Sequence, residues 1–150
     1  MKLFEWILFF PFVAQGLAIA VDEFYFHHRR GLPQWERVGH PIDTLSVFAC
    51  FLFVLLVPYS EPALLGYIGL AAFSCLLVTK DEFVHQEICT KTESWLHAVL
   101  FILHPLTFVS AGFFWYGNFG REILLVQTGL IGTFLIYQVL YWRPQWVRTK

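Results

Sequence analysis

Five apolar segments divide the chain, and each is long enough, or nearly so, to cross a bilayer as a helix. They cover residues 3–26, 42–59, 63–79, 95–116 and 123–142. A hydrocarbon core of about 30 Å requires a helix of about 20 apolar residues. Of the 150 residues, 57% are hydrophobic and 14% are charged, which is typical of a membrane protein. The sequence therefore predicts an all-α integral membrane protein, a single domain over residues 1–150 with about five transmembrane helices.

Basic residues indicate the orientation of these helices. With five crossings, one side of the membrane holds Lys2 and Arg121. The other side holds the remaining basic residues, namely Arg29, Arg30, Arg37, Lys80, Lys91, Arg143, Arg148 and Lys150. Because cytoplasmic loops carry the excess of lysine and arginine, we expect the N-terminus outside and the C-terminus in the cytoplasm, in a bacterial inner membrane. A net charge of -1 and the lack of a basic face argue against nucleic acid as a partner.

The first apolar segment also resembles a signal peptide, because Ala18-Ile19-Ala20 is typical of a cleavage site. Lys2 is the one basic residue before it, and Glu5 interrupts the apolar run. Cleavage would remove a helix that carries the acids and histidines of residues 22–28 into the membrane. These features favour a first helix that is retained.

Acidic residues and histidines gather at the cytoplasmic ends of the predicted helices. All six histidines lie within residues 22–43 and 80–104, on one side of the membrane. Ionisable residues inside a membrane usually mark a functional site, and mixed imidazole and carboxylate ligands suit a divalent metal. The predicted ligands are Glu23, His27, His28, His40, Asp43, Asp81, Glu82, His85, Glu93, His97 and His104. The alternative is a solvated polar face, whose acids and histidines serve topology, solubility or lipid headgroups. For Asp43, helix capping is a further alternative, because Pro41 suits the first turn of the second helix, which would make His40 its N-cap.

Spacing along the helices supports a metal site. Glu23 and His27 share a helical face because they are four residues apart, and Glu93 and His97 repeat this spacing. His104 lies seven residues after His97, which is about 10 Å deeper in the membrane. We therefore expect His104 to bind a second ion, to hold a ligand in place or to hydrogen-bond a buried carbonyl.

The two polar stretches repeat one pattern. D-E-F is followed by histidine and then by E-x-x-x-H at the entry of the next helix, first in residues 22–43 and again in residues 80–104. The two copies occupy matching topological positions. We interpret them as a parallel repeat, with helices one to four forming two repeated hairpins in a bundle.

Glu82-x-x-His85 resembles the E-x-x-H element of the carboxylate-bridged di-iron helix bundles, with Glu36 or Glu93 to supply further ligands. Glu23-x-x-x-His27 departs from that element by one residue. His27-His28 is similar to a fragment of the histidine boxes of membrane hydroxylases and desaturases, although their full H-x-x-x-H and H-x-x-H-H boxes are missing. The resemblance implies an iron pair beside an apolar substrate slot.

The leading hypothesis is a membrane-embedded metalloenzyme, a di-iron-type oxidoreductase that acts on a membrane lipid or lipophilic small molecule at the cytoplasmic face. Its cofactor would be one or two divalent ions, iron first and zinc or manganese otherwise, and an electron donor is an expected partner. Glu82 and Glu93 are the predicted catalytic residues. The alternatives are a zinc hydrolase with Glu82, Glu93 or Asp22 as general base, and a non-enzymatic metal-binding, haem-binding or transport protein.

Overall fold

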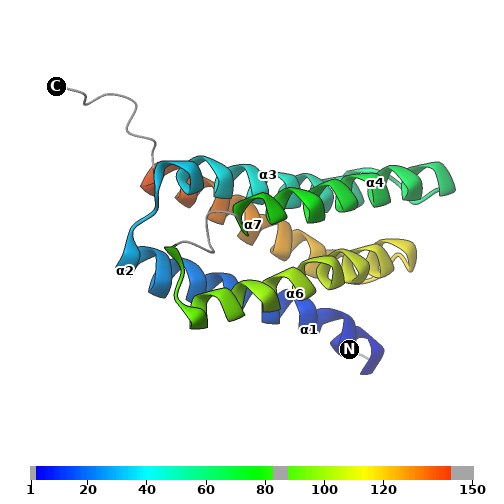
Figure 1. Ribbon diagram of the computed structural model, residues 1–150. Coiled ribbons are helices and arrows are strands. Elements are labelled where there is room, and N and C mark those ends of the chain that lie inside the picture. The colour runs from blue at the N-terminus through cyan, green and yellow to red at the C-terminus, as the bar shows by residue number, and fades with distance from the viewer. Residues whose placement is uncertain (1–2, 83–87, 143–150) are drawn as a thin grey trace.

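The computed structural model describes residues 3–82 and 88–142, and every regular element in that part of the chain is a helix (Figure 1). The elements in chain order are α1 (Leu3–Val21), η1 (Asp22–His27), α2 (His28–Arg30), α3 (Gln34–Leu56), α4 (Glu61–Leu77), η2 (Val78–Asp81), α6 (Lys91–Tyr116) and α7 (Arg121–Tyr141).

Five helices are long and apolar enough to cross a membrane, as predicted. They are Leu3–Arg30, Gln34–Leu56, Glu61–Lys80, Lys91–Tyr116 and Arg121–Tyr141, the first of which combines α1, η1 and α2. Large apolar side chains are exposed on the outside of the bundle, as expected for helices that face lipid; examples are Leu17, Leu65, Leu76 and Leu140. The all-helical class and the number of apolar helices are confirmed.

The second apolar helix begins about two turns earlier than its hydropathy indicates. Gly31, with a φ of 77°, ends the first helix, and α3 starts directly after Pro33. The expectation that His40 caps this helix is wrong, because the helix continues through Pro41. Its first turns are polar and include the buried Glu36 as well as the exposed Gln34, and hydropathy does not detect such a segment. His40 and Asp43 therefore lie on a helix.

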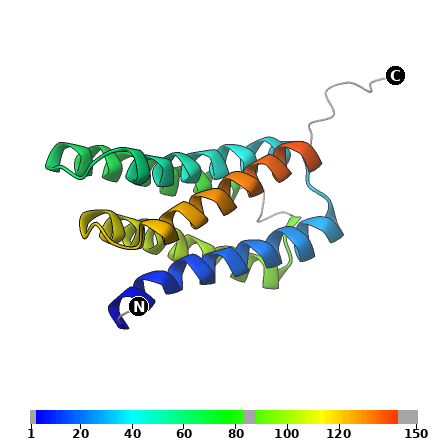
Figure 2. The same cartoon turned by 180° about the vertical axis from the view of Figure 1, so that it is seen from behind.

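The helices form two pairs that α7 joins on one side. α1 packs along α6, and α3 packs along both α4 and α7 (Figures 1 and 2). The chain connects α1 to α3 and α4 to α6, as the proposed hairpins require, but α1 packs mainly against a helix of the other proposed hairpin. The repeat of hairpins therefore stays a prediction.

An aromatic core fills the half of the bundle that contains the N-terminus. Phe12 from α1 contacts Phe51 from α3 and Phe114 from α6, with ring centroids 5.6 and 5.8 Å apart. The Tyr67 hydroxyl in the same core donates a hydrogen bond to the carbonyl oxygen of Phe108 at 2.7 Å. Apolar packing thus stabilises one half of the bundle, which leaves the other half for buried polar groups.

Candidate metal centre

The first helix changes its winding where its acidic residues begin. η1 is a π-helix, and its wider turn brings residues five apart into contact as well as residues four apart. Nε2 of His27 lies 3.2 Å from Oδ2 of Asp22, and Nδ1 of His27 lies 3.3 Å from Oε2 of Glu23. All three side chains are consequently buried inside the bundle. Short π-helical turns in α-helices are frequent at functional sites.

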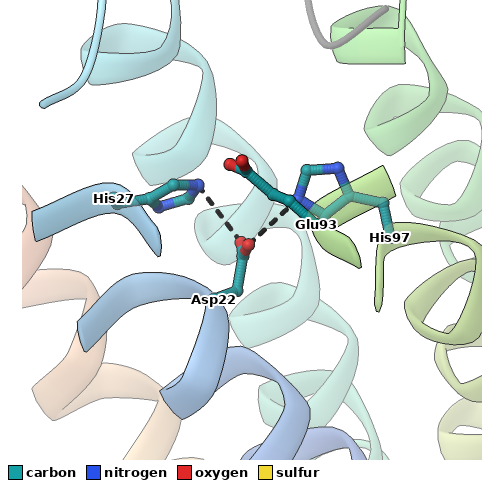
Figure 3. A group of neighbouring side chains, drawn as sticks. All are labelled: Asp22, His27, Glu93 and His97. Carbon is teal, nitrogen blue, oxygen red and sulfur yellow. Dashed lines mark hydrogen bonds and ion pairs between the residues drawn. The ribbon is translucent and has the colours of Figure 1, made fainter. Parts of the chain in front are cut away.

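Four side chains converge from η1 and α6 to form the first ligand group. Asp22, His27, Glu93 and His97 each offer one nitrogen or oxygen atom, and these atoms all lie within 4.8 Å of one another (Figure 3). Asp22 stands between the two imidazoles, with its Oδ1 3.0 Å from Nε2 of His97. The group thus provides two nitrogen and two oxygen donors in a buried position, a set that suits iron, zinc or manganese.

A second ligand group adjoins the first. Glu23, His27 and His40 also offer donor atoms within 4.8 Å of one another, and the rings of His27 and His40 are 4.8 Å apart. Oε1 of Glu23 accepts hydrogen bonds from the Tyr137 hydroxyl at 3.1 Å and from the Trp142 indole. His27 belongs to both groups, so the arrangement allows one ion in the first group or neighbouring ions in both.

Arginine neutralises only part of the buried acidic charge. Nη2 of Arg30 donates to Oε2 of Glu36 at 3.1 Å and to Oε1 of Glu93 at 3.0 Å. Within the described part of the chain, Asp22 and Glu23 contact histidine, tyrosine and tryptophan side chains but no lysine or arginine. Two buried carboxylates that meet no fixed cation favour either protonated histidines or a bound metal ion.

Two of the predicted ligands, His28 and Asp43, contact residues outside the ligand groups. His28 is exposed, stacks on Tyr141 and shares a hydrogen bond of 2.8 Å with the hydroxyl of Tyr137. Asp43 forms an ion pair with Lys80, whose Nζ lies 2.7 Å from both carboxylate oxygens. The structure therefore brings together Glu23, His27, His40, Glu93 and His97 but places His28 and Asp43 outside both groups.

Of the ligands predicted within residues 80–90, the structure describes the side chain of Glu82 alone. Glu82 is half-buried and belongs to neither ligand group. His85 and the side chain of Asp81 lie outside the described residues, so the E-x-x-H element stays a prediction. Burial raises the pKa of the Cys89 thiol to about 12.

His104 lies two turns along α6 from the ligand groups and belongs to neither of them. Its Nδ1 is 3.1 Å from Nε2 of Gln15, and its Nε2 is 3.2 Å from Oγ of Ser74. Of the three roles expected for this histidine, these contacts correspond most closely to a hydrogen-bonding one, with side-chain partners rather than a carbonyl.

A long cavity leads from the metal-ligand groups into the bundle. Its volume is about 790 Å³, within the range of pockets that hold small organic ligands. Asp22, Glu23, His27, His40 and His97 line one end of it. The remaining wall is mainly apolar and comes from α1, α3, α6 and α7, with Phe9, Leu17, Val47, Phe101, Leu130 and Phe134 among its residues.

Sequence reasoning missed two residues of this site. Asp22 was expected at most to act as a base, because the period of an α-helix places it on a different face from His27. The signal that identifies it is the spacing of five residues between the two, which only a π-helical turn brings together. Gln15 was not selected at all, although it lies seven residues before Asp22, the spacing that also separates His97 from His104.

Comparisons with protein families, curated proteins and solved structures found no match for the chain.

Proposed function

We propose that the chain is a membrane-embedded, metal-dependent enzyme that acts on a lipophilic substrate, with iron as the first choice of metal. The supporting observation is that a buried group of histidines and carboxylates lies at the end of a long apolar cavity. A lipophilic molecule in that cavity would extend to the ligand groups. On the predicted topology this end of the bundle faces the cytoplasm, where an electron donor would meet it.

The donor set of the first ligand group supports this choice. Asp22, His27 and His97 are the two-histidine, one-carboxylate combination of many non-haem iron enzymes, and Glu93 adds a further oxygen. Iron in such a site would supply oxygen activation. The residues of the chain would hold the ion, exclude water and position the substrate, and an ion at Glu23 and His40 would give the di-iron form.

The aromatic core is unfavourable for transport. Phe12, Phe51 and Phe114 pack together, each is almost fully buried, and Phe12 and Phe51 also form part of the cavity wall. A metal or proton carrier would need polar groups that continue through this half of the bundle. An enzyme whose substrate enters and leaves from the membrane has no such requirement.

Elemental analysis of protein purified in detergent after growth with added metal tests the proposal. We expect the wild type to hold at least stoichiometric metal and the His97→Gln variant to lose it. His28→Gln is the matched control, because His28 is exposed and lies outside both ligand groups. A visible or near-ultraviolet absorption band would identify iron rather than zinc. Substoichiometric metal in the wild type, or equal loss in both variants, would overturn the proposal.

A further inference from the structure

A chain of hydrogen bonds crosses four helices in the middle of the bundle. Nε2 of Gln15 on α1 lies 3.1 Å from Nδ1 of His104 on α6, and Nε2 of His104 lies 3.2 Å from Oγ of Ser74 on α4. Oγ of Ser74 is 2.7 Å from Oγ of Ser46 on α3, which donates to the carbonyl oxygen of Asp43 at 2.7 Å. The four side chains are all buried.

The last hydrogen bond of this series, from Ser46 to the Asp43 carbonyl, determines which group is the donor in each of the others. The Ser46 hydroxyl has one proton, which goes to the Asp43 carbonyl, so the Ser74 hydroxyl must donate to Ser46. Ser74 can then only accept from His104, which requires a proton on Nε2 of that imidazole. In the neutral ring Nδ1 is an acceptor, and its partner must be the amide nitrogen of Gln15.

This direction fixes the orientation of the Gln15 amide. Because Nε2 of Gln15 donates to His104, its Oε1 is left to accept a hydrogen bond. Within the described part of the chain, this oxygen is buried and has no partner, and Gln15 lines the cavity with 6% of its surface exposed. A buried acceptor without a donor is costly, so the oxygen marks a place where a ligand can donate.

We propose that the cavity binds a single-chain lipid alcohol, whose hydroxyl donates to Oε1 of Gln15. A hydroxyl is a neutral donor, which suits a mainly apolar wall; an ammonium group would be costly at this depth, and an ether, an ester or an ionised acid has no proton to donate. Gln15 lies seven residues from Asp22, so the hydroxyl would bind about 10 Å from the ligand groups. That this alcohol is also the substrate rests on the proposed function.

Photolabelling in lipid nanodiscs tests the inference without any need for turnover. The wild type is labelled with a long-chain alcohol that carries a diazirine, and unlabelled dodecanol or dodecyl methyl ether competes. One hydrogen bond at a buried acceptor should make dodecanol about tenfold the better competitor. The Gln15→Leu variant should lose this preference. Gln127→Leu is the matched control, because Gln127 lines the same cavity on α7 but is not part of the hydrogen-bonded chain, and it should keep the preference.

A second variant tests the series of hydrogen bonds rather than the Gln15 amide itself. Ser74→Ala removes the acceptor that sets the His104 tautomer, so the Gln15 amide can turn. The preference for the alcohol should fall several-fold, while competition by the ether stays unchanged. Unchanged ether competition also shows that the Gln15→Leu variant is folded.

Three results would overturn the inference: equal competition by alcohol and ether in the wild type, a preference that survives Gln15→Leu, or an equal loss in Gln127→Leu. Metal analysis of the same samples separates it from the proposed function. Protein that prefers the alcohol but binds no metal would refute the enzyme proposal alone. Protein that binds metal without the preference would refute the lipid-alcohol site alone.

Discussion

Replacing Arg30 with methionine is expected to destabilise the bundle strongly. The Arg30 side chain is 19% exposed, and its Nη2 contacts the carboxylates of Glu36 and Glu93, whose side chains are 0% and 1% exposed. Methionine retains an apolar stem of similar length. It removes the cation, however, and leaves both buried carboxylates without that partner.

The size of the effect follows from this geometry. At an effective dielectric constant of about 20, opposite charges 3.0 Å apart attract by roughly 5 kcal/mol, and the loss of water around each charge offsets much of this. Removing one partner of a buried ion pair typically reduces stability by about 3–5 kcal/mol. For a chain of this length, 1 kcal/mol corresponds to about 2–4 °C in the unfolding midpoint. We therefore expect Arg30→Met to lower the midpoint by about 10 °C.

Thermal unfolding in detergent, followed by circular dichroism, measures this shift. Adding Glu36→Gln to the Arg30→Met variant should recover part of the loss, because it removes one of the two carboxylate charges that Arg30 contacts in the wild type. Arg29→Met is the control, since Arg29 is exposed and lies over the Tyr25 ring at 4.6 Å, so its midpoint should change little. A shift of less than about 2 °C in Arg30→Met, or no recovery in the double variant, would refute the reasoning.

Four further single substitutions test metal binding or stability. Glu93→Gln should reduce the metal content, whereas Glu36→Gln, which loses a contact with the same arginine but lies outside both ligand groups, should retain it in elemental analysis. Asp43→Asn breaks the ion pair with Lys80 and should reduce the free energy of unfolding by about 1–2 kcal/mol with no change in metal content; loss of metal would show that Asp43 is a ligand after all. Gly31→Ala forces a side chain to a φ of 77°, so the unfolding midpoint should fall by the equivalent of about 1–3 kcal/mol, and an unchanged midpoint would contradict this.

Hydropathy located the helices because most residues of each helix are apolar, both on the exposed surface and in the core. It was less accurate at helix ends that line the interior, where polar residues belong to the helix. The predicted fourth span begins at Trp95, but α6 begins at Lys91 because Thr90 and Glu93 form a capping box. The late start predicted for the second helix has a different cause, since its first turn contains the fully buried carboxylate of Glu36.

Predicting the site required more than residue spacing. The sequence indicates that acids and histidines gather at one end of the bundle, and five predicted ligands do lie together there. Two features could not be predicted. The π-helical turn that brings Asp22 to His27 departs from the ordinary helical period, and the packing of α1 on α6 joins helices that are far apart in the chain. Without that packing, His97 has no assigned partner on the first helix.

The antiparallel packing of α1 on α6 relates the two polar layers of the bundle to each other (Figure 1). Asp22 meets His97 in one layer, and seven residues away on both helices Gln15 meets His104 in the other. A seven-residue repeat keeps one face of a helix against its neighbour, and buried polar residues on such a face can specify the register between helices. To specify the register, each polar side chain needs only a hydrogen bond to its partner on the other helix. Gln15 does more than this, because it lines the cavity and its buried Oε1 has no partner in the described part of the chain, while its Nε2 holds His104. The register that pairs the helices therefore also sets the separation between the metal-ligand groups and the proposed hydroxyl site.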